Sequence, residues 1–599
     1  MRLAAATLIP IFFLGLLELG LRLAGYGYPT RLFLPAKIGG EDFLVPNEKF
    51  THRFFPPGLA RAPLSTAVMP VRKPAKSQRI FLMGESAAYG DPDSSFGVGR
   101  YLEVLLEQRY PDHDFEVICV AITAINSHVI LPIARECARL DGDMWVVYMG
   151  NNEMVGPYGA STVFGNRAPA LGFVRIALAL KKTRLGQLMD QLVTSMRGGS
   201  QAPESWAGID MFRKNPLQHD DPLRLRAYEN FKANLADILN VANQAGVPVV
   251  LSTVASNLRD CSPFLSMHRT DLAAADLAEW QRNFDQGHAL EKSGSPQAAL
   301  DVYQKAAAID SGFAELHFRI GTCQLALDDR AGASSSFERA RDHDALAVRA
   351  DRRINRIITD AMEKNAVSGL DAVTALASHT SDGIPGKEHF YEHVHLTMAG
   401  NYLLACALAG KVAERLPAGI TATGSEGTFE AELEACNRGL AVTLWDQKRV
   451  WEIALGRISV APFTSQSSHP QNRRYCQERI KEVDFKTTAM TPVRDRRMYE
   501  TALEQNPGDT QMRWNYAQFL ERAGKLAEAA DQGVLICERL PHSAWTHYFT
   551  GSVMARQGEI AEAADYLQRA IRINPELSHA RLELDEIRRK YPTALTSVK

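Results

Sequence analysis

The sequence predicts a three-layer α/β domain with a parallel sheet, joined to all-α helical repeats. Short apolar runs alternate with helix-like segments between residues 79 and 149, which is the pattern of a parallel sheet covered by helices on both faces. Two later stretches repeat with a spacing of 34 residues, which is typical of paired helices stacked in an array. A chain of 599 residues is too long for one hydrophobic core, so we expect several domains.

The composition is that of an ordinary globular protein, with 46% apolar and 23% charged residues. A formal net charge of −2 gives no reason to expect a nucleic-acid partner. The eight cysteines are scattered without a Cys-x-x-Cys pair, so we expect small core residues, while disulfides stay open. Gly97-Val-Gly99 lacks the rest of a phosphate-binding loop. We therefore expect no cofactor and no metal.

The N-terminus is apolar. Leu3 to Leu17 carries no charge, and about 20 such residues are needed to span a bilayer as a helix. Glu18 and Arg22 lie one helical turn apart and can pair, which lowers the cost of burying both. We predict a membrane anchor over residues 1–25. The alternatives are a cleaved signal peptide, although its n-region holds only Arg2, and a hydrophobic helix packed on the soluble domain.

The first two hundred and fifty residues contain the predicted sheet. Residues 26–76 are rich in Pro, Gly and aromatics without a period, and we expect an extended lead-in. The next elements are predicted as strand 79–84, helix 97–109, strand 115–122, helix 126–139 and strand 144–149. An irregular insertion, 154–220, with one helix near 171–195, is expected to border the active-site crevice. A helix near 225–245 then leads to a fourth strand, 247–253.

The helical repeats are predicted from small and aromatic residues that recur in register. In the first array, Gly287, Ala299, Tyr303 and Ala306 recur as Gly321, Ala333, Phe337 and Ala340. In the second array, three successive units share positions Tyr499, Ala502 and Pro507, then Ala517, Ala529 and Pro541, then Gly551, Ala563, Leu567, Ala570 and Pro575. The spacing and residue types resemble the tetratricopeptide repeat, in which small residues let two antiparallel helices approach closely.

These boundaries divide the chain into seven parts. They are the anchor or signal (1–25), the lead-in (26–76), the first part of the α/β domain (77–275), the inserted repeats (276–350), the second part of the α/β domain (351–420), a helical connector (421–485) and the C-terminal repeats (486–592).

Ser86 is the first candidate for chemistry. It follows the apolar run Ile80 to Met83 and the turn residue Gly84. In an open α/β sheet, ligands bind in the crevice beyond the carboxyl ends of the strands. A serine placed there at the start of a helix is a candidate nucleophile. The alternative is a serine that only caps the following helix.

Four segments in order resemble the SGNH/GDSL hydrolase superfamily. Gly84-Glu-Ser86 follows the first strand, Ala121 lies near the end of the second, Gly150-Asn-Asn-Glu153 ends the third, and Glu392 stands three residues before His395. The resemblance covers residues 79–160 and 385–410. It implies an α/β hydrolase domain of the three-layer type and a catalytic triad of Ser86, His395 and Glu392.

The resemblance assigns a role to each residue of that triad. His395 would be the base that takes the proton of Ser86, because a serine hydroxyl is a poor nucleophile without one. Glu392 stands where the family usually has Asp and would hold the far nitrogen of the imidazole. His393 and His389 are nearby rivals, and their alternative role is that of ordinary polar loop residues.

The resemblance also implies an oxyanion hole. Its donors would be the backbone N–H of Ser86, the backbone N–H at Ala121, and the side-chain amide of Asn152. Asn151 is expected to make the turn. Ala121 stands where the family usually has Gly, and a backbone donor survives there if alanine can adopt the local φ. Glu85 is expected to be structural.

The function that follows from the resemblance is that of a membrane-anchored serine esterase, with acetyl esters on cell-envelope glycans as a plausible substrate class. An O-acyltransferase that uses the same serine is the close alternative. A catalytically degenerate scaffold is the other, because repeat arrays present surfaces that bind protein partners. The expected location is a bacterial inner membrane, with the body of the protein extracytoplasmic.

Overall fold

The computed structural model describes residues 2–196, 203, 205–424 and 428–592. Its centre is a five-stranded sheet with the strand order β5-β4-β6-β7-β8, and all neighbouring strands are parallel. The strands are β4 (Ser77–Gly84), β5 (Asp114–Cys119), β6 (Met144–Tyr148), β7 (Val249–Ser252) and β8 (Ser368–Leu370). The four strands predicted from apolar runs are present. The strand β4 begins two residues earlier than predicted, and β5, β6 and β7 end earlier than predicted. The fifth, β8, is only three residues long and was not predicted.

Helices cover both faces of this sheet. One layer contains α3 (Val98–Arg109) and α14 (Met398–Ala413), which pack against each other. The other contains α4 (Ser127–Cys137), α7 (Pro222–Ala245) and α12 (Arg352–Asn365), in which α7 packs against the other two. All five residues of β6 are buried, which is why its sequence is continuously apolar instead of alternating.

The lead-in differs from its prediction. Residues 26–76 were expected to be extended without regular structure, but they contain a small antiparallel sheet of β1 (Phe33–Ile38), β2 (Glu41–Pro46) and β3 (Met69–Pro70). Its strands have no alternating apolar pattern, because the packed side chains come mainly from the segments around them, including Phe50 and Phe54. The insertion also differs, since the single helix expected near 171–195 is a pair, α5 (Leu171–Leu180) and α6 (Arg184–Met196).

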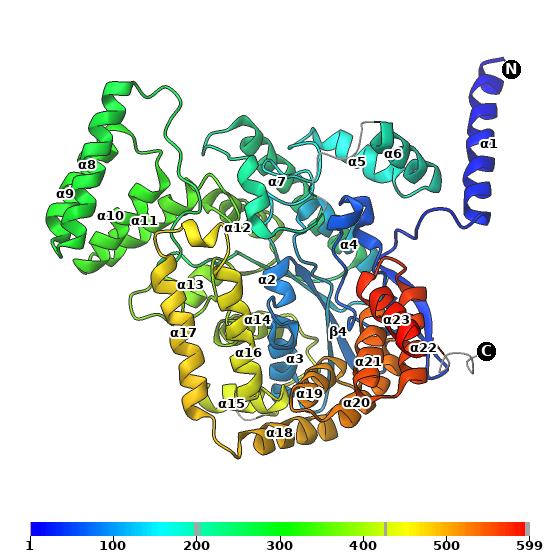
Figure 1. The fold of residues 1–599 in the computed structure, drawn as a ribbon. Coiled ribbons are helices and arrows are strands. Elements are labelled where there is room, and N and C mark those ends of the chain that lie inside the picture. Colours follow the sequence, from blue (N-terminus) through cyan, green and yellow to red (C-terminus); the bar gives the residue numbers. More distant parts are fainter. Residues whose placement is uncertain (1, 197–202, 204, 425–427, 593–599) are drawn as a thin grey trace.

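Two arrays of paired helices flank the α/β domain (Figure 1). The inserted array contains α8 (Ala274–Lys292), α9 (Pro296–Ile309), α10 (Ala314–Ala326) and α11 (Arg330–Asp342). The C-terminal array contains α18 (Thr491–Gln505), α19 (Thr510–Arg522), α20 (Leu526–Arg539), α21 (Ala544–Gln557), α22 (Ile560–Ile573) and α23 (Ser578–Lys590). The recurring glycines lie where helices touch, since a Cβ at Gly287 would come within 2.6 Å of the Tyr303 ring.

A helical connector joins the α/β domain to the C-terminal array. It contains α15 (Phe429–Gly439), α16 (Leu444–Ile458) and α17 (His469–Lys486). A capping box between Thr443 and Asp446 fixes the start of α16. Arg457, near the end of α16, contacts Asp91 and Glu392, so the connector contributes directly to the candidate site.

The N-terminal segment forms α1 (Arg2–Leu23), in which Arg22 and Glu18 are 2.7 Å apart. In the part of the chain that the structure describes, no helix is long and apolar enough to cross a membrane. All eight cysteines are free thiols, six of them buried and two half-buried.

Candidate active site

Ser86 lies immediately beyond the carboxyl end of β4. The strand ends at Gly84, and Ser86 is the first residue of the short helix α2 (Ser86–Tyr89). A Cβ at Gly84 would come within 2.2 Å of the Tyr148 carbonyl oxygen and 2.5 Å of the Ala88 Cβ. Only glycine fits there, because β6 and the first turn of α2 both close on this position. The tight turn exposes the Ser86 side chain at the sheet edge, where ligands bind in open α/β sheets.

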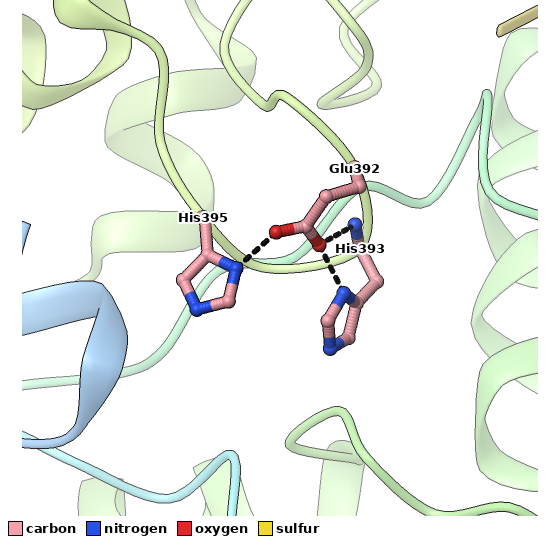
Figure 2. A group of neighbouring side chains, drawn as sticks. All are labelled: Glu392, His393 and His395. Carbon is pink, nitrogen blue, oxygen red and sulfur yellow. Dashed lines mark hydrogen bonds and ion pairs between the residues drawn. The ribbon is translucent and has the colours of Figure 1, made fainter. Parts of the chain in front are cut away.

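The structure brings Ser86, His395 and Glu392 together from segments about 300 residues apart. Ser86 Oγ lies 2.8 Å from His395 Nε2. The other ring nitrogen of His395, Nδ1, is hydrogen-bonded to Glu392 Oε1. The second oxygen, Oε2, contacts Nδ1 of His393 and also accepts from the backbone N–H of His393 (Figure 2). The carboxylate therefore lies between two imidazoles, and only His395 reaches the serine.

The charge state of this cluster follows from its neighbours. Burial acts to raise the pKa of Glu392, but His393 and His395 outweigh it and hold the pKa well below its ordinary value. Burial lowers the pKa of His393, whose ring packs edge-on against Phe264 and Phe463. His393 contacts Glu392 through both its ring and its backbone N–H, and so holds the carboxylate in place. His389 lies outside the cluster, and burial lowers its pKa to about 4.

Two charged residues that the sequence analysis did not select join the cluster. Asp91 Oδ2 lies 3.3 Å from His395 Nε2. Arg457, near the end of α16, lies 2.9 Å from Asp91 Oδ2, 3.4 Å from Glu392 Oε1 and 3.0 Å from His395 Nδ1. Burial acts to raise the pKa of Asp91, but His395 and Arg457 outweigh it and lower the pKa. No local pattern marks Arg457, because its partners are distant in sequence.

The residues expected to bind an oxyanion are placed around the same sheet edge. Asn151 is engaged elsewhere, because its Oδ1 accepts from the Ala350 N–H at 3.0 Å. Asn152 is half-buried, and its side-chain amide makes no hydrogen bond with any residue that the structure describes. Glu85 accepts from the N–H groups of Asn151 and Asn152 at 2.8 and 3.2 Å, which ties the serine loop to the asparagine loop. This is the structural role expected for Glu85.

Ala121, the second expected backbone donor, lies just beyond the end of β5. It is fully buried, and its φ is not positive. Three residues later, Ala124 is half-buried and has a φ of 61°, the left-handed conformation that favours glycine. Ala124 is thus the residue after β5 that has the glycine-like backbone conformation. A positive φ cannot be read from an alanine in a sequence.

The same cluster has the atom types of a metal site. Ligand atoms of Glu392, His393 and His395 all lie within 4.8 Å of one another. Hydrogen bonds from the two Nδ1–H groups to the one carboxylate already account for this arrangement. The guanidinium of Arg457, 3.4 Å from the Glu392 oxygen, places a positive charge where an ion would have to bind. Both observations favour a hydrogen-bonded triad over a metal site.

Comparison with known proteins identifies the repeats. A family model described as tetratricopeptide repeat matches residues 496–544, within α18 to α21. The C-terminal array therefore contains tetratricopeptide repeats, as predicted. No curated protein matched the chain.

Similar solved structures are also repeat proteins. They include YrrB, a TPR protein with an unusual peptide-binding site (15% identity, covering 51% of this chain and 90% of that one, TM-score 0.16) and the TPR2AB-domain:pHSP90 complex of yeast Sti1 (10%, 52% and 98%, TM-score 0.15). A tetratricopeptide repeat protein from Parabacteroides merdae is a third (12%, 52% and 99%, TM-score 0.16). The low TM-scores mean that these similarities carry no argument about the whole chain.

Proposed function

We propose that this protein is a serine esterase with an SGNH/GDSL-type catalytic domain. The observation that carries the proposal is the 2.8 Å contact between Ser86 Oγ and His395 Nε2, with Glu392 on the far nitrogen of the same ring. A base within hydrogen-bond reach of a serine, itself oriented by a third group, is the arrangement that activates a hydroxyl. The contact joins two segments that the sequence resemblance had selected independently.

The proposed reaction has two stages. Ser86 Oγ attacks the ester carbonyl while His395 Nε2 takes its proton, and His395 then gives this proton to the departing alcohol. Water, deprotonated by His395, attacks the acyl-serine and releases the acid, and Ser86 recovers its proton. In both stages the positive imidazolium lies between Glu392 and Asp91, which stabilise the charge that develops on it.

The negative charge that forms on the carbonyl oxygen needs donors at the same sheet edge. We propose the Ser86 N–H and the Asn152 side-chain amide, together with a backbone N–H from residues 121–124. The unoccupied amide of Asn152 supports its part in this set. Removing one such donor costs about 3 kcal/mol of transition-state stabilisation in known hydrolases. For Asn152→Ala we therefore expect kcat to fall by about 100-fold or more.

Labelling with a fluorophosphonate probe tests the proposal directly. Full-length protein should be labelled, and Ser86→Ala and His395→Ala should not be. His389→Ala is the matched control, because it removes a nearby histidine outside the cluster, and it should leave labelling intact. Failure to label a well-folded wild-type chain would overturn the esterase proposal.

The substrate class is proposed by analogy with the resembled superfamily, which supports acetyl esters on cell-envelope glycans. An O-acyltransferase would differ only in the acceptor, a sugar hydroxyl in place of water. Acetate release from an acetylated glycan without any added acceptor would exclude a strict transferase. Acetate release that begins only when an acceptor glycan is supplied would instead replace the esterase assignment.

A protein-binding scaffold is the second candidate function. The family match at residues 496–544 favours it, because tetratricopeptide arrays present surfaces suited to peptide or protein partners. Two of the similar solved structures are described by their peptide site and their pHSP90 complex, and we extend this to a protein partner here only as a proposal. In cells that lack the gene, full rescue of the phenotype by Ser86→Ala would favour the scaffold over the esterase.

We also propose that the protein works at a membrane surface, with its body on the extracytoplasmic side of a bacterial inner membrane. The helices α5 and α6 support this, because they expose large apolar side chains, including Phe173, Ile176 and Met196. Lys181 and Lys182 connect the two helices, and an apolar face flanked by basic residues suits an anionic lipid surface. Sedimentation with phosphatidylglycerol vesicles, lost in Phe173→Ser/Ile176→Ser, would support the proposal, and unchanged sedimentation would contradict it.

A further inference from the structure

A cavity of about 280 Å³ lies between the α/β domain and the C-terminal repeats. One wall is the segment that follows α2, from Tyr89 to Ser95. The opposite wall is formed by α19 and by the start of α21. Residues 64–66 of the lead-in close a third side. The cavity therefore exists only because the repeats are docked on the catalytic domain.

The lining combines aromatic rings with uncharged polar groups. Tyr89, Trp514 and Trp545 supply the rings, and Trp545 is 50% exposed although it is a large aromatic side chain. Gln518 lines the same cavity, and its side chain has no hydrogen-bond partner among the described residues. Thr66 Oγ1, also in the lining, is buried without a partner in that part of the chain. Unused donors and acceptors beside exposed aromatic rings are the features of a ligand site.

The charged groups of the lining neutralise each other. Asp93 is paired with Arg449, and Asn515 Nδ2 lies 3.5 Å from the same Asp93 oxygen. No unpaired charge among the described lining residues then remains to hold an ionic ligand. A neutral ligand with hydroxyl groups and an apolar face satisfies both the polar side chains and the rings. A sugar ring has this chemistry.

The cavity is connected to the catalytic residues by one short segment and one helix. Asp91 contacts His395, and two residues later Asp93 lines the cavity. On α16, Arg457 holds Asp91 and Arg449 holds Asp93. Eight residues along a helix correspond to about 12 Å. A ligand unit in the cavity is therefore within a short chain length of Ser86.

We propose that this cavity binds a neutral sugar unit of an oligosaccharide whose neighbouring unit carries the ester that Ser86 attacks. The inference rests on the proposed esterase function and deepens it by naming a neutral glycan as the substrate class. The C-terminal repeats thereby act as one wall of a substrate site. An uncharged peptide is the competing occupant, and the test below separates the two.

Binding is tested apart from catalysis. Calorimetric titration of the full chain with neutral, unacetylated hexasaccharides of xylose, mannose, glucose and N-acetylglucosamine should show saturable binding of at least one. Trp545→Ala and Gln518→Ala should each weaken this binding by about tenfold or more. Phe485→Ala is the matched control, since Phe485 is 91% exposed and lies outside the cavity lining, and it should bind as the wild type does.

The kinetic arm uses two esters, an acetylated form of the bound hexasaccharide and p-nitrophenyl acetate. In Trp545→Ala the ratio of kcat/KM for the oligosaccharide to that for the small ester should fall about tenfold, mainly through KM. No hexasaccharide binding, or binding of uncharged peptides alone, would overturn the sugar site even if the serine is labelled. Sugar binding without any ester hydrolysis would keep the site and reject the esterase.

Discussion

The two repeat arrays are built from the same helical unit but relate to the α/β domain in different ways. The inserted array has its own small core around Trp280 and Tyr303, and α8 and α9 project away from the sheet (Figure 1). It also contacts the segments on either side of it. His268 bonds Asp310, and the Glu315 N–H donates to Ser266 Oγ. Leu258 and Ile384 form a small buried cluster with residues of α10 and α11, including Phe318 and Phe337. The array is thus attached through α10 and α11, whereas α8 and α9 stand away from the sheet.

The C-terminal array lies against the α/β domain. Asp509 pairs with Arg100 on α3, and Gln511 Nε2 donates to Ser94 Oγ at 2.8 Å. His542 contacts the Ser65 carbonyl oxygen in the lead-in. Ser94 and Ser65, which are held in this way, also line the cavity beside the candidate active site. The comparison teaches that the repeat unit does not determine its own role, because the role depends on what the array packs against.

The largest expected effect on stability comes from a substitution in the C-terminal array. Asp509→Ala removes the partner of Arg100 and the N-cap of α19, where Asp509 accepts from the Met512 N–H at 3.0 Å. Breaking a buried ion pair from one side costs about 3–5 kcal/mol. Because Arg100 keeps Glu103 as a second partner, we expect the lower end, about 3 kcal/mol, in urea unfolding. The proposed ester hydrolysis should fall together with the free energy of unfolding. A variant with wild-type stability would show that the docking contact is dispensable.

A pair of glycine substitutions sharpens the comparison. A Cβ at Gly287 meets the Tyr303 ring at 2.6 Å, and one at Gly551 meets Ala563 O and Leu567 Cγ at 3.0 Å. Valine at either position should cost about 1–3 kcal/mol through overpacking. For Gly287→Val we expect a separate early transition in thermal unfolding and unchanged fluorophosphonate labelling. For Gly551→Val the temperature of the main unfolding transition and the extent of labelling should both fall. If the two variants behave alike, the proposed difference between the two arrays is wrong.

Removal of a helix cap in the inserted array should have a smaller effect on stability. Asp329 accepts from the Gly332 N–H at 2.9 Å at the start of α11. Loss of such a cap costs about 1 kcal/mol. Asp329→Ala should therefore raise amide hydrogen exchange in α10 and α11, while exchange in the sheet stays as in the wild type. Raised exchange in β4 or β6 would show that the inserted array is coupled to the α/β domain after all.

The last prediction concerns the dependence of stability on pH, which should be absent near neutrality. Burial lowers the pKa of His542 in the C-terminal array and of His343 at the end of α11 to about 4. Unfolded histidine titrates near pH 6.5, so below that pH the unfolded chain binds protons that the folded chain does not. Stability should therefore decline as the pH falls from about 6.5 to 4.

Matched substitutions assign this decline to the two arrays. His542→Gln should flatten the decline of the main unfolding transition, measured in urea at pH 7 and 5. In the Gly287→Val background, where the inserted array is expected to unfold in a separate early transition, His343→Gln should flatten only the decline of that transition. If neither substitution changes the slope, other buried groups cause the pH dependence.

The sequence by itself determined the elements whose signals are local. Apolar runs predicted four strands of the sheet, and the turn at Gly84 placed Ser86 at the strand end. The recurrence of Gly287, Tyr303 and their counterparts predicted paired helices, because close helix packing requires a small residue opposite an aromatic one within the same unit. The triad residues were selected through a family resemblance, since nothing local links Ser86 to His395.

Tertiary structure decided the rest, because it depends on residues that meet only after the chain folds. Arg457 reaches Asp91 and Glu392 from the connector helix, and no pattern around Arg457 distinguishes it from other helix-surface arginines. The strand β8 is too short to have a periodic signal. The positive φ of Ala124 is imposed by the surrounding structure on a residue that does not favour it. The repeats were visible in the sequence, whereas the packing of only one array against the serine loop required complementary side chains from distant segments.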